Sequence, residues 1–149
     1  MRYLCLPLVL AIAGTLSAQS RQRRFDPIPT ADQQSFTRQP RVALLIGVGK
    51  YPRGSGLSEL RYPARDVDLL AAELEKQGYT VVTIKESDAT RTVVRRALRD
   101  LAEVVDPNQG TLVFYFSGHG FAVNTKNYLA TFDAGADELQ TSGLALEEV

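Results

Sequence analysis

Three short apolar segments, separated by stretches with helical periodicity, constrain the fold of this chain more than any other feature. They are residues 42–48, 79–84 and 111–116. The first and third are almost entirely apolar, as expected of strands buried on both faces of a sheet, and the second is rich in β-branched residues. Each gap leaves room for one helix, so we predict βαβ units, a parallel sheet and right-handed crossovers.

Two segments carry the apolar spacing of helices that pack on a sheet. In the first, residues 64–78, the apolar stripe consists of Val67, Leu70, Ala71 and Leu74, and Gly78 supplies the C-terminal stop. In the second, Thr90 is the expected N-cap. The stripe of this second helix consists of Val94, Ala97, Leu98, Leu101 and Val105.

Downstream of the third predicted strand the pattern is weaker. Apolar pieces on either side of residues 124–127 predict a small hairpin. We expect a loop over residues 133–141 and the start of another helix over residues 142–149.

Charge and cysteine content exclude several classes of protein. Lys+Arg and Asp+Glu both number 17, which argues against binding nucleic acid through bulk positive charge. A single cysteine, Cys5, excludes an intrachain disulfide and a Cys-rich zinc site. The single histidine, His119, must serve any chemistry that needs an imidazole.

The first 40 residues are expected to lie outside the folded domain. Residues 1–18 have the layout of a signal peptide: Arg2, an apolar run, then small residues up to Ala18. The run is shorter than the roughly 20 residues of a membrane span, so we expect export to the periplasm or medium with no membrane anchor after cleavage. A buried N-terminal helix is the alternative. Residues 19–40 are predicted to form an extended arm.

Two phosphate-binding motifs and one nucleophile motif can be set aside. The Gly-rich loop at residues 49–63 lacks the spacing of a P-loop or of a dinucleotide fingerprint. This argues against a flavodoxin-like nucleotide binder. Ser117 does not form a nucleophile elbow, because Tyr115 stands where the motif needs glycine.

His119 is the strongest candidate for chemistry. It directly follows a predicted parallel strand, at the carboxyl edge where α/β sheets form their sites. Such a histidine suits a general acid or base, although a structural role is the alternative. The flanking Gly118 and Gly120 permit a sharp turn and close approach of another segment. Ser117 can be a turn residue or a ligand contact.

The run TLVFYFSGHG resembles the strand and histidine motif of the caspase-like cysteine peptidases, in particular their bacterial metacaspase (orthocaspase) branch. The segments RVALLIGVGKY, LRYPARDVDLLAAEL, GYTVVTIKESDATR and YLATFDA follow the order of that family. The resemblance spans residues 41–149. It implies a three-layer α/β/α fold with a mainly parallel sheet, strand order second-first-third, incomplete at the C-terminus.

The resemblance also implies a cysteine endopeptidase that acts on polypeptides. His119 matches the histidine of the catalytic dyad, and the backbone N–H of Gly120 matches an oxyanion donor. Asp66 and Ser117 match residues of an acidic pocket that selects Arg or Lys before the scissile bond. Asp66 has an alternative role as a charge at a helix N-terminus. No cofactor or resident metal is implied, and calcium activation stays open.

The family nucleophile belongs to an Asp-x-Cys element one helix and one strand further along than Val149. The only cysteine here is Cys5, inside the predicted signal peptide. We therefore expect either a fragment of a longer enzyme or a truncated product. The corresponding functions are a cysteine endopeptidase and a non-catalytic caspase-like module that binds a partner or peptide.

Overall fold

The computed structural model describes residues 34, 36, 38–105 and 110–149. The predicted signal peptide at residues 1–18 lies outside the described residues, as does most of the predicted arm at residues 19–40. Within that arm, the described residues 34, 36 and 38 are helical, so the prediction of an extended arm is wrong there. None of the helices in the described part of the chain has the length and apolarity that crossing a bilayer requires.

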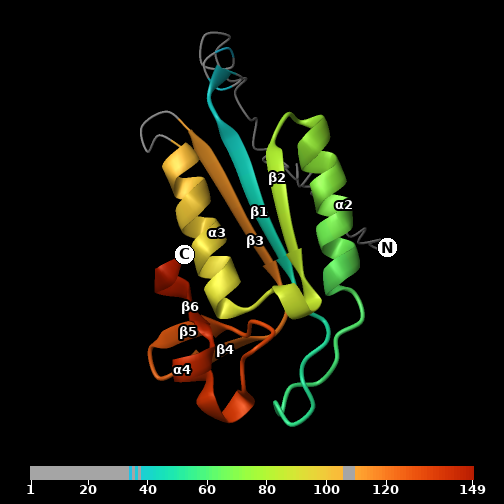
Figure 1. The fold of residues 1–149 in the computed structure, drawn as a ribbon, viewed down its shortest axis with the longest axis vertical. Helices are drawn as coiled ribbons and strands as arrows, with labels where there is room; N and C mark the ends of the chain where they lie inside the picture. The colour runs from blue at the N-terminus through green and yellow to red at the C-terminus, as the bar shows by residue number, and fades with distance from the viewer. Residues whose placement is uncertain (1–33, 35, 37, 106–109) are drawn as a thin grey trace, which may run out of the picture.

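A three-stranded parallel sheet forms the centre of the domain (Figure 1). Its strands are β1 (Arg41–Gly47), β2 (Thr80–Lys85) and β3 (Thr111–Ser117), in the order β2-β1-β3. In the register of the sheet, Leu44 of β1 lies opposite Val82 of β2 and Phe114 of β3. The predicted strands, their parallel pairing and their order are confirmed.

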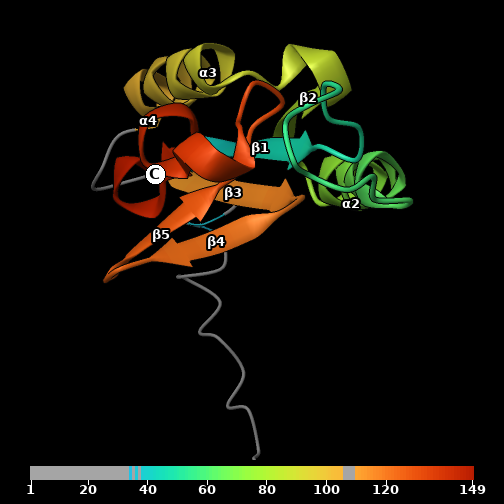
Figure 2. The ribbon, with the colours of Figure 1, turned by 90° about the horizontal axis from the view of Figure 1, so that it is seen from below.

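Helices α2 (Pro63–Lys76) and α3 (Arg91–Val104) cover opposite faces of this sheet (Figure 2). Alternate residues of β1 point to opposite faces. Ala43 and Leu45 pack with Val67 and Ala71 of α2. Leu44 and Ile46 pack in a second core with Val94 and Leu98 of α3. The result is the α/β/α layering that the family resemblance implies.

The helix ends follow the predicted signals. Pro63, whose missing N–H costs nothing at a first helical position, opens α2. Gly78 adopts a φ of 80° two residues after α2 ends, where an L side chain would be strained. A 3₁₀ turn, η1 (Glu86–Asp88), precedes α3, and the Thr90 hydroxyl accepts a hydrogen bond from the N–H of Val93.

A second, antiparallel sheet follows β3. It contains β4 (Gly120–Val123), β5 (Lys126–Leu129) and β6 (Leu144–Ala145), in the order β4-β5-β6. The predicted hairpin is confirmed, with Asn124 at a φ of 56° in its two-residue turn.

The prediction of a helix start over residues 142–149 is wrong. Helix α4 (Leu139–Ser142) ends there, after a 3₁₀ turn η2 (Ala136–Glu138), and the chain then forms β6 and the 3₁₀ turn η3 (Leu146–Glu148). The reason lies in tertiary contacts. Leu144 is fully buried in the core beneath α3 and pairs with Leu129, which requires an extended backbone.

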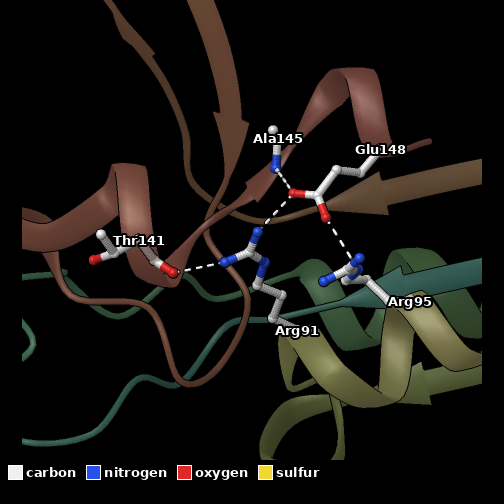
Figure 3. A network of polar contacts seen from close by, with 5 residues as sticks. All are labelled: Arg91, Arg95, Thr141, Ala145 and Glu148. Atoms are coloured by element: carbon white, nitrogen blue, oxygen red, sulfur yellow. Dashed lines mark hydrogen bonds and ion pairs between the residues drawn. The ribbon is translucent and has the colours of Figure 1, made fainter.

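Glu148 connects the second sheet to α3 (Figure 3). Its carboxylate accepts hydrogen bonds from the N–H of Ala145 at 3.1 Å and from Arg91 at 2.8 Å, and it pairs with Arg95 at 3.0 Å. Arg91 also donates to the carbonyl of Thr141 at 2.6 Å. Burial acts to raise the pKa of Glu148, but these hydrogen bonds and the two arginine charges together hold that pKa below its ordinary value.

We predict that Glu148→Gln lowers the free energy of unfolding by about 1 kcal/mol at neutral pH. A carboxylate whose pKa is lowered by folding stabilises the protein above its unfolded-state pKa, and this contribution disappears as the pH falls through the folded-state value. Urea unfolding between pH 7 and about pH 3 measures the difference. The difference in free energy of unfolding between the wild type and Glu148→Gln should shrink on acidification. The control Glu147→Gln, at an exposed neighbouring position, should have the stability of the wild type at every pH. A difference that does not depend on pH contradicts the ion-pair assignment.

Candidate functional site

The loops that follow β1 and β3 meet at the carboxyl edge of the parallel sheet. Gly47, the last residue of β1, lies opposite Ser117, the last residue of β3. The N–H of Val48 continues this pairing with a 2.9 Å hydrogen bond to the carbonyl of Ser117. Both loops therefore leave the sheet side by side.

His119 is held at this edge by the loop after β1. Its Nε2 lies 2.8 Å from the carbonyl oxygen of Ser58 and 3.4 Å from the Ser58 hydroxyl. A carbonyl oxygen only accepts hydrogen bonds, so Nε2 carries the proton in this contact. Nδ1 makes no hydrogen bond within the described residues, and it is the nitrogen without a proton whenever the ring is neutral with Nε2 protonated. The geometry leaves one nitrogen of the imidazole available to take up a proton.

Two aromatic rings flank the imidazole. The ring of Tyr51 lies 5.3 Å from that of His119 and the ring of Phe121 lies 6.0 Å from it, both tilted. The Tyr51 hydroxyl also accepts a hydrogen bond from the backbone N–H of His119 at 3.1 Å. Sequence reasoning missed Tyr51 and Ser58. Ser58 acts mainly through a backbone carbonyl, which leaves no residue-specific signal.

The two glycines beside His119 differ in their surroundings. A Cβ at Gly118 would lie 2.8 Å from the Phe116 ring and 3.1 Å from the Tyr51 hydroxyl, so the predicted close approach occurs there. A Cβ at Gly120 would meet only the Tyr128 carbonyl, at 3.8 Å. Neither glycine has the positive φ that a left-handed turn requires. The expectation of close approach is therefore wrong for Gly120.

Gly120 instead offers a backbone donor. It lies opposite Leu129, while the carbonyl of the preceding His119 accepts a hydrogen bond from Ala130 at 2.9 Å. This is the pattern of a non-hydrogen-bonded pair in an antiparallel ladder. The N–H of Gly120 therefore points away from β5.

Ser117 and Asp66 lie on the elements that border the site. Ser117 ends β3 and Asp66 is in the first turn of α2, and both are half-buried. Neither side chain makes a hydrogen bond or ion pair with the described residues. No such contact joins them to each other or to His119 either. The position of Asp66 suits a pocket carboxylate and a helix-terminus charge equally.

Within the described residues, no group of three or more His, Cys, Asp or Glu side chains could hold a metal ion.

A family model described as the caspase domain matches residues 40–147. The chain belongs to the caspase-domain family. The match covers every element from β1 to β6. His119 lies inside the matched segment.

A solved structure shares the fold of this chain. The crystal structure of protein GSU0716 from Geobacter sulfurreducens matches with a TM-score of 0.59 and 23% sequence identity. The match covers 73% of this chain and 42% of that one, so this chain spans less than half of that protein. Among curated protein sequences, none matches this chain significantly.

The two glycines give a matched pair of variants. Gly118→Ala should lower the free energy of unfolding by about 1–3 kcal/mol, because the Phe116 ring must move to admit the methyl group. Gly120→Ala should change it by no more than about 0.5 kcal/mol. Urea denaturation of both variants measures these effects. If both variants lost the same free energy of unfolding, the close contact of Gly118 with the Phe116 ring would be contradicted.

Proposed function

We propose that this chain is the histidine-bearing part of a cysteine endopeptidase of the metacaspase type, which cleaves polypeptides after Arg or Lys. The observation that carries the proposal is the hydrogen bonding of the His119 ring within a caspase domain. Its Nε2–H is bonded to the carbonyl of Ser58, and its Nδ1 is left without a hydrogen bond among the described residues. This is the arrangement that a general base needs, because the ring is oriented and one nitrogen is available.

In this proposal, His119 acts with a cysteine that the described residues do not contain. Nδ1 accepts the proton of the cysteine thiol, and the thiolate sulfur attacks the scissile carbonyl carbon. When the C–N bond breaks, Nδ1 gives this proton to the leaving amine. Water then cleaves the thioester and restores the thiol. The Ser58 carbonyl stabilises the positive imidazolium ring between the proton transfers, because its oxygen carries a partial negative charge.

The N–H of Gly120 is the proposed donor to the negatively charged oxygen that forms during attack. Its direction away from β5 supports this role, since the amide is not used by the ladder. The donor comes from the backbone, so any residue at position 120 that keeps the local conformation retains it.

Asp66 and Ser117 are the proposed pocket for the basic side chain of the substrate. A cation entering a pocket loses hydration and needs a fixed anion in return. The Asp66 carboxylate makes no hydrogen bond or ion pair with the described residues, which leaves it available. The Ser117 hydroxyl can accept a further hydrogen bond from the substrate.

The second candidate is a non-catalytic module that binds a peptide or partner. The observation in its favour is that the single cysteine of the sequence, Cys5, lies in the apolar segment at residues 1–18. In the endopeptidase proposal, residues 1–18 serve only as an export signal, so Cys5 is not the nucleophile.

Peptidase activity in an extended form separates the two candidates, and His119→Ala tests the dyad. The 149-residue chain should cleave no peptide, whereas a form extended past Val149 through the proposed cysteine should cleave one with Arg before the scissile bond. His119→Ala in the extended form should lower kcat/KM by about 10²- to 10⁴-fold. Thr92→Ala, on the exposed face of α3, should leave turnover unchanged. Normal turnover by His119→Ala would falsify the dyad assignment, and no turnover by the extended wild type favours the binding module.

Asp66→Asn tests the pocket. The substitution keeps the shape of the side chain and removes its charge, so it should cost about 2–5 kcal/mol of transition-state binding for Arg and Lys substrates. Asp68→Asn is the matched control, because Asp68 lies in the same helix and pairs with Lys85. The assay compares peptides with Arg, Lys, Asp or Leu before the scissile bond. If Asp66 is only a helix-terminus charge, the variant loses about 0.3–1 kcal/mol of stability and keeps its preference, and the pocket assignment fails.

A further inference from the structure

The hydroxyl of Tyr51 joins three segments that are far apart in sequence. It accepts a hydrogen bond from the backbone N–H of His119 at 3.1 Å and donates one to the carbonyl of Ala130 at 3.2 Å. Tyr51 comes from the loop after β1, His119 follows β3, and Ala130 follows β5. The Tyr51 ring also packs against the core beneath α3 and against the small cluster formed by Ala130, Ala134 and Leu139.

Beyond the end of the β1–β3 ladder, the Tyr51 hydroxyl takes the place of a backbone carbonyl as the acceptor for the N–H of His119. The β1–β3 ladder stops at the pair Gly47 and Ser117, followed by the bond from Val48 to Ser117. Two residues later, the carbonyl of His119 is bonded to the N–H of Ala130. Since Tyr51 takes the N–H of His119, both backbone polar groups of the histidine are fixed. Removing the hydroxyl leaves the His119 N–H and the Ala130 carbonyl without this partner.

The loop that carries Tyr51 is itself anchored. The Glu86 carboxylate accepts hydrogen bonds from the N–H of Gly49 at 3.2 Å and of Lys50 at 2.8 Å. Glu86 has a φ of 49°, in the left-handed region that residues other than glycine seldom occupy. This strained turn at the end of β2 aims the carboxylate at the loop and fixes the residues just before Tyr51.

The surroundings also keep the Tyr51 hydroxyl protonated. Burial raises its pKa, and the negative charge of Glu86 adds to the rise, while the hydrogen bond from His119 offsets only part of it. A protonated hydroxyl is needed for the bond to Ala130, because a phenolate cannot donate.

We propose that Tyr51 is a positioning residue for His119. By fixing the backbone on which the imidazole is mounted, it keeps Nε2 on the carbonyl of Ser58 and leaves Nδ1 available for proton transfer. The catalytic consequence rests on the proposed function, whereas the effect on the backbone of His119 does not.

The test is Tyr51→Phe, with Tyr115→Phe as the matched control. Tyr115 is also half-buried, on β3, and its hydroxyl makes no hydrogen bond with the described residues. The first readout is amide hydrogen exchange of His119 in the 149-residue chain, relative to the amide of Leu45 in β1. This ratio removes any uniform change in stability. It should rise at least about tenfold in Tyr51→Phe and stay unchanged in Tyr115→Phe.

The second readout is the kinetics of the extended form. Tyr51→Phe should lower kcat about tenfold and leave KM unchanged, since the substrate is bound normally but the base is less well placed. An unchanged exchange ratio in Tyr51→Phe, or an equal rise in Tyr115→Phe, overturns the positioning role. A raised ratio with unchanged kcat overturns its catalytic consequence. An extended wild type without activity overturns the proposed function instead, and the exchange ratio then decides the positioning role alone.

Discussion

The site depends on the burial of β1 on both of its faces. From Val42 to Ile46 no residue is more than 3% exposed. A strand that is apolar on both faces needs a helix over each face and a paired strand at each edge, and here α2, α3, β2 and β3 provide them. Parallel pairing of β1 with β3 brings the ends of these two strands together. That register brings the loop that carries Ser58 and the segment that carries His119 to the same edge, where the two residues are in contact.

The histidine is oriented by groups from a loop that is distant in the sequence. Its imidazole is bonded to a carbonyl oxygen and its backbone N–H to the Tyr51 hydroxyl, and both partners come from the loop after β1. Gly118 allows Tyr51 and the Phe116 ring to approach this closely. Such an arrangement tolerates many residue types at position 58. Position 51 differs, because its contacts with His119 and Ala130 are made by a side-chain hydroxyl.

Periodicity predicted the parallel sheet, its two helices and the position of His119, because those patterns arise from burial within single elements. The short elements after Ala130 were harder to predict from the sequence. Residues 142–149 have a helical composition, yet the burial of Leu144 and the ion pairs of Glu148 impose a strand and a 3₁₀ turn. Long-range contacts of this kind cannot be read from local spacing. The roles of Ser58 and Tyr51 were missed for the same reason.

The central claim is that His119 activates a cysteine thiol. The most direct measurement is labelling of the extended form by a peptide acyloxymethyl ketone that ends in Arg, in which a thiolate displaces the carboxylate and forms a stable thioether. Mass spectrometry identifies the modified residue and follows its rate of labelling. The account predicts one labelled cysteine, other than Cys5, and much slower labelling in His119→Ala. Labelling at the same rate with and without His119, or no labelling of any cysteine, would contradict it.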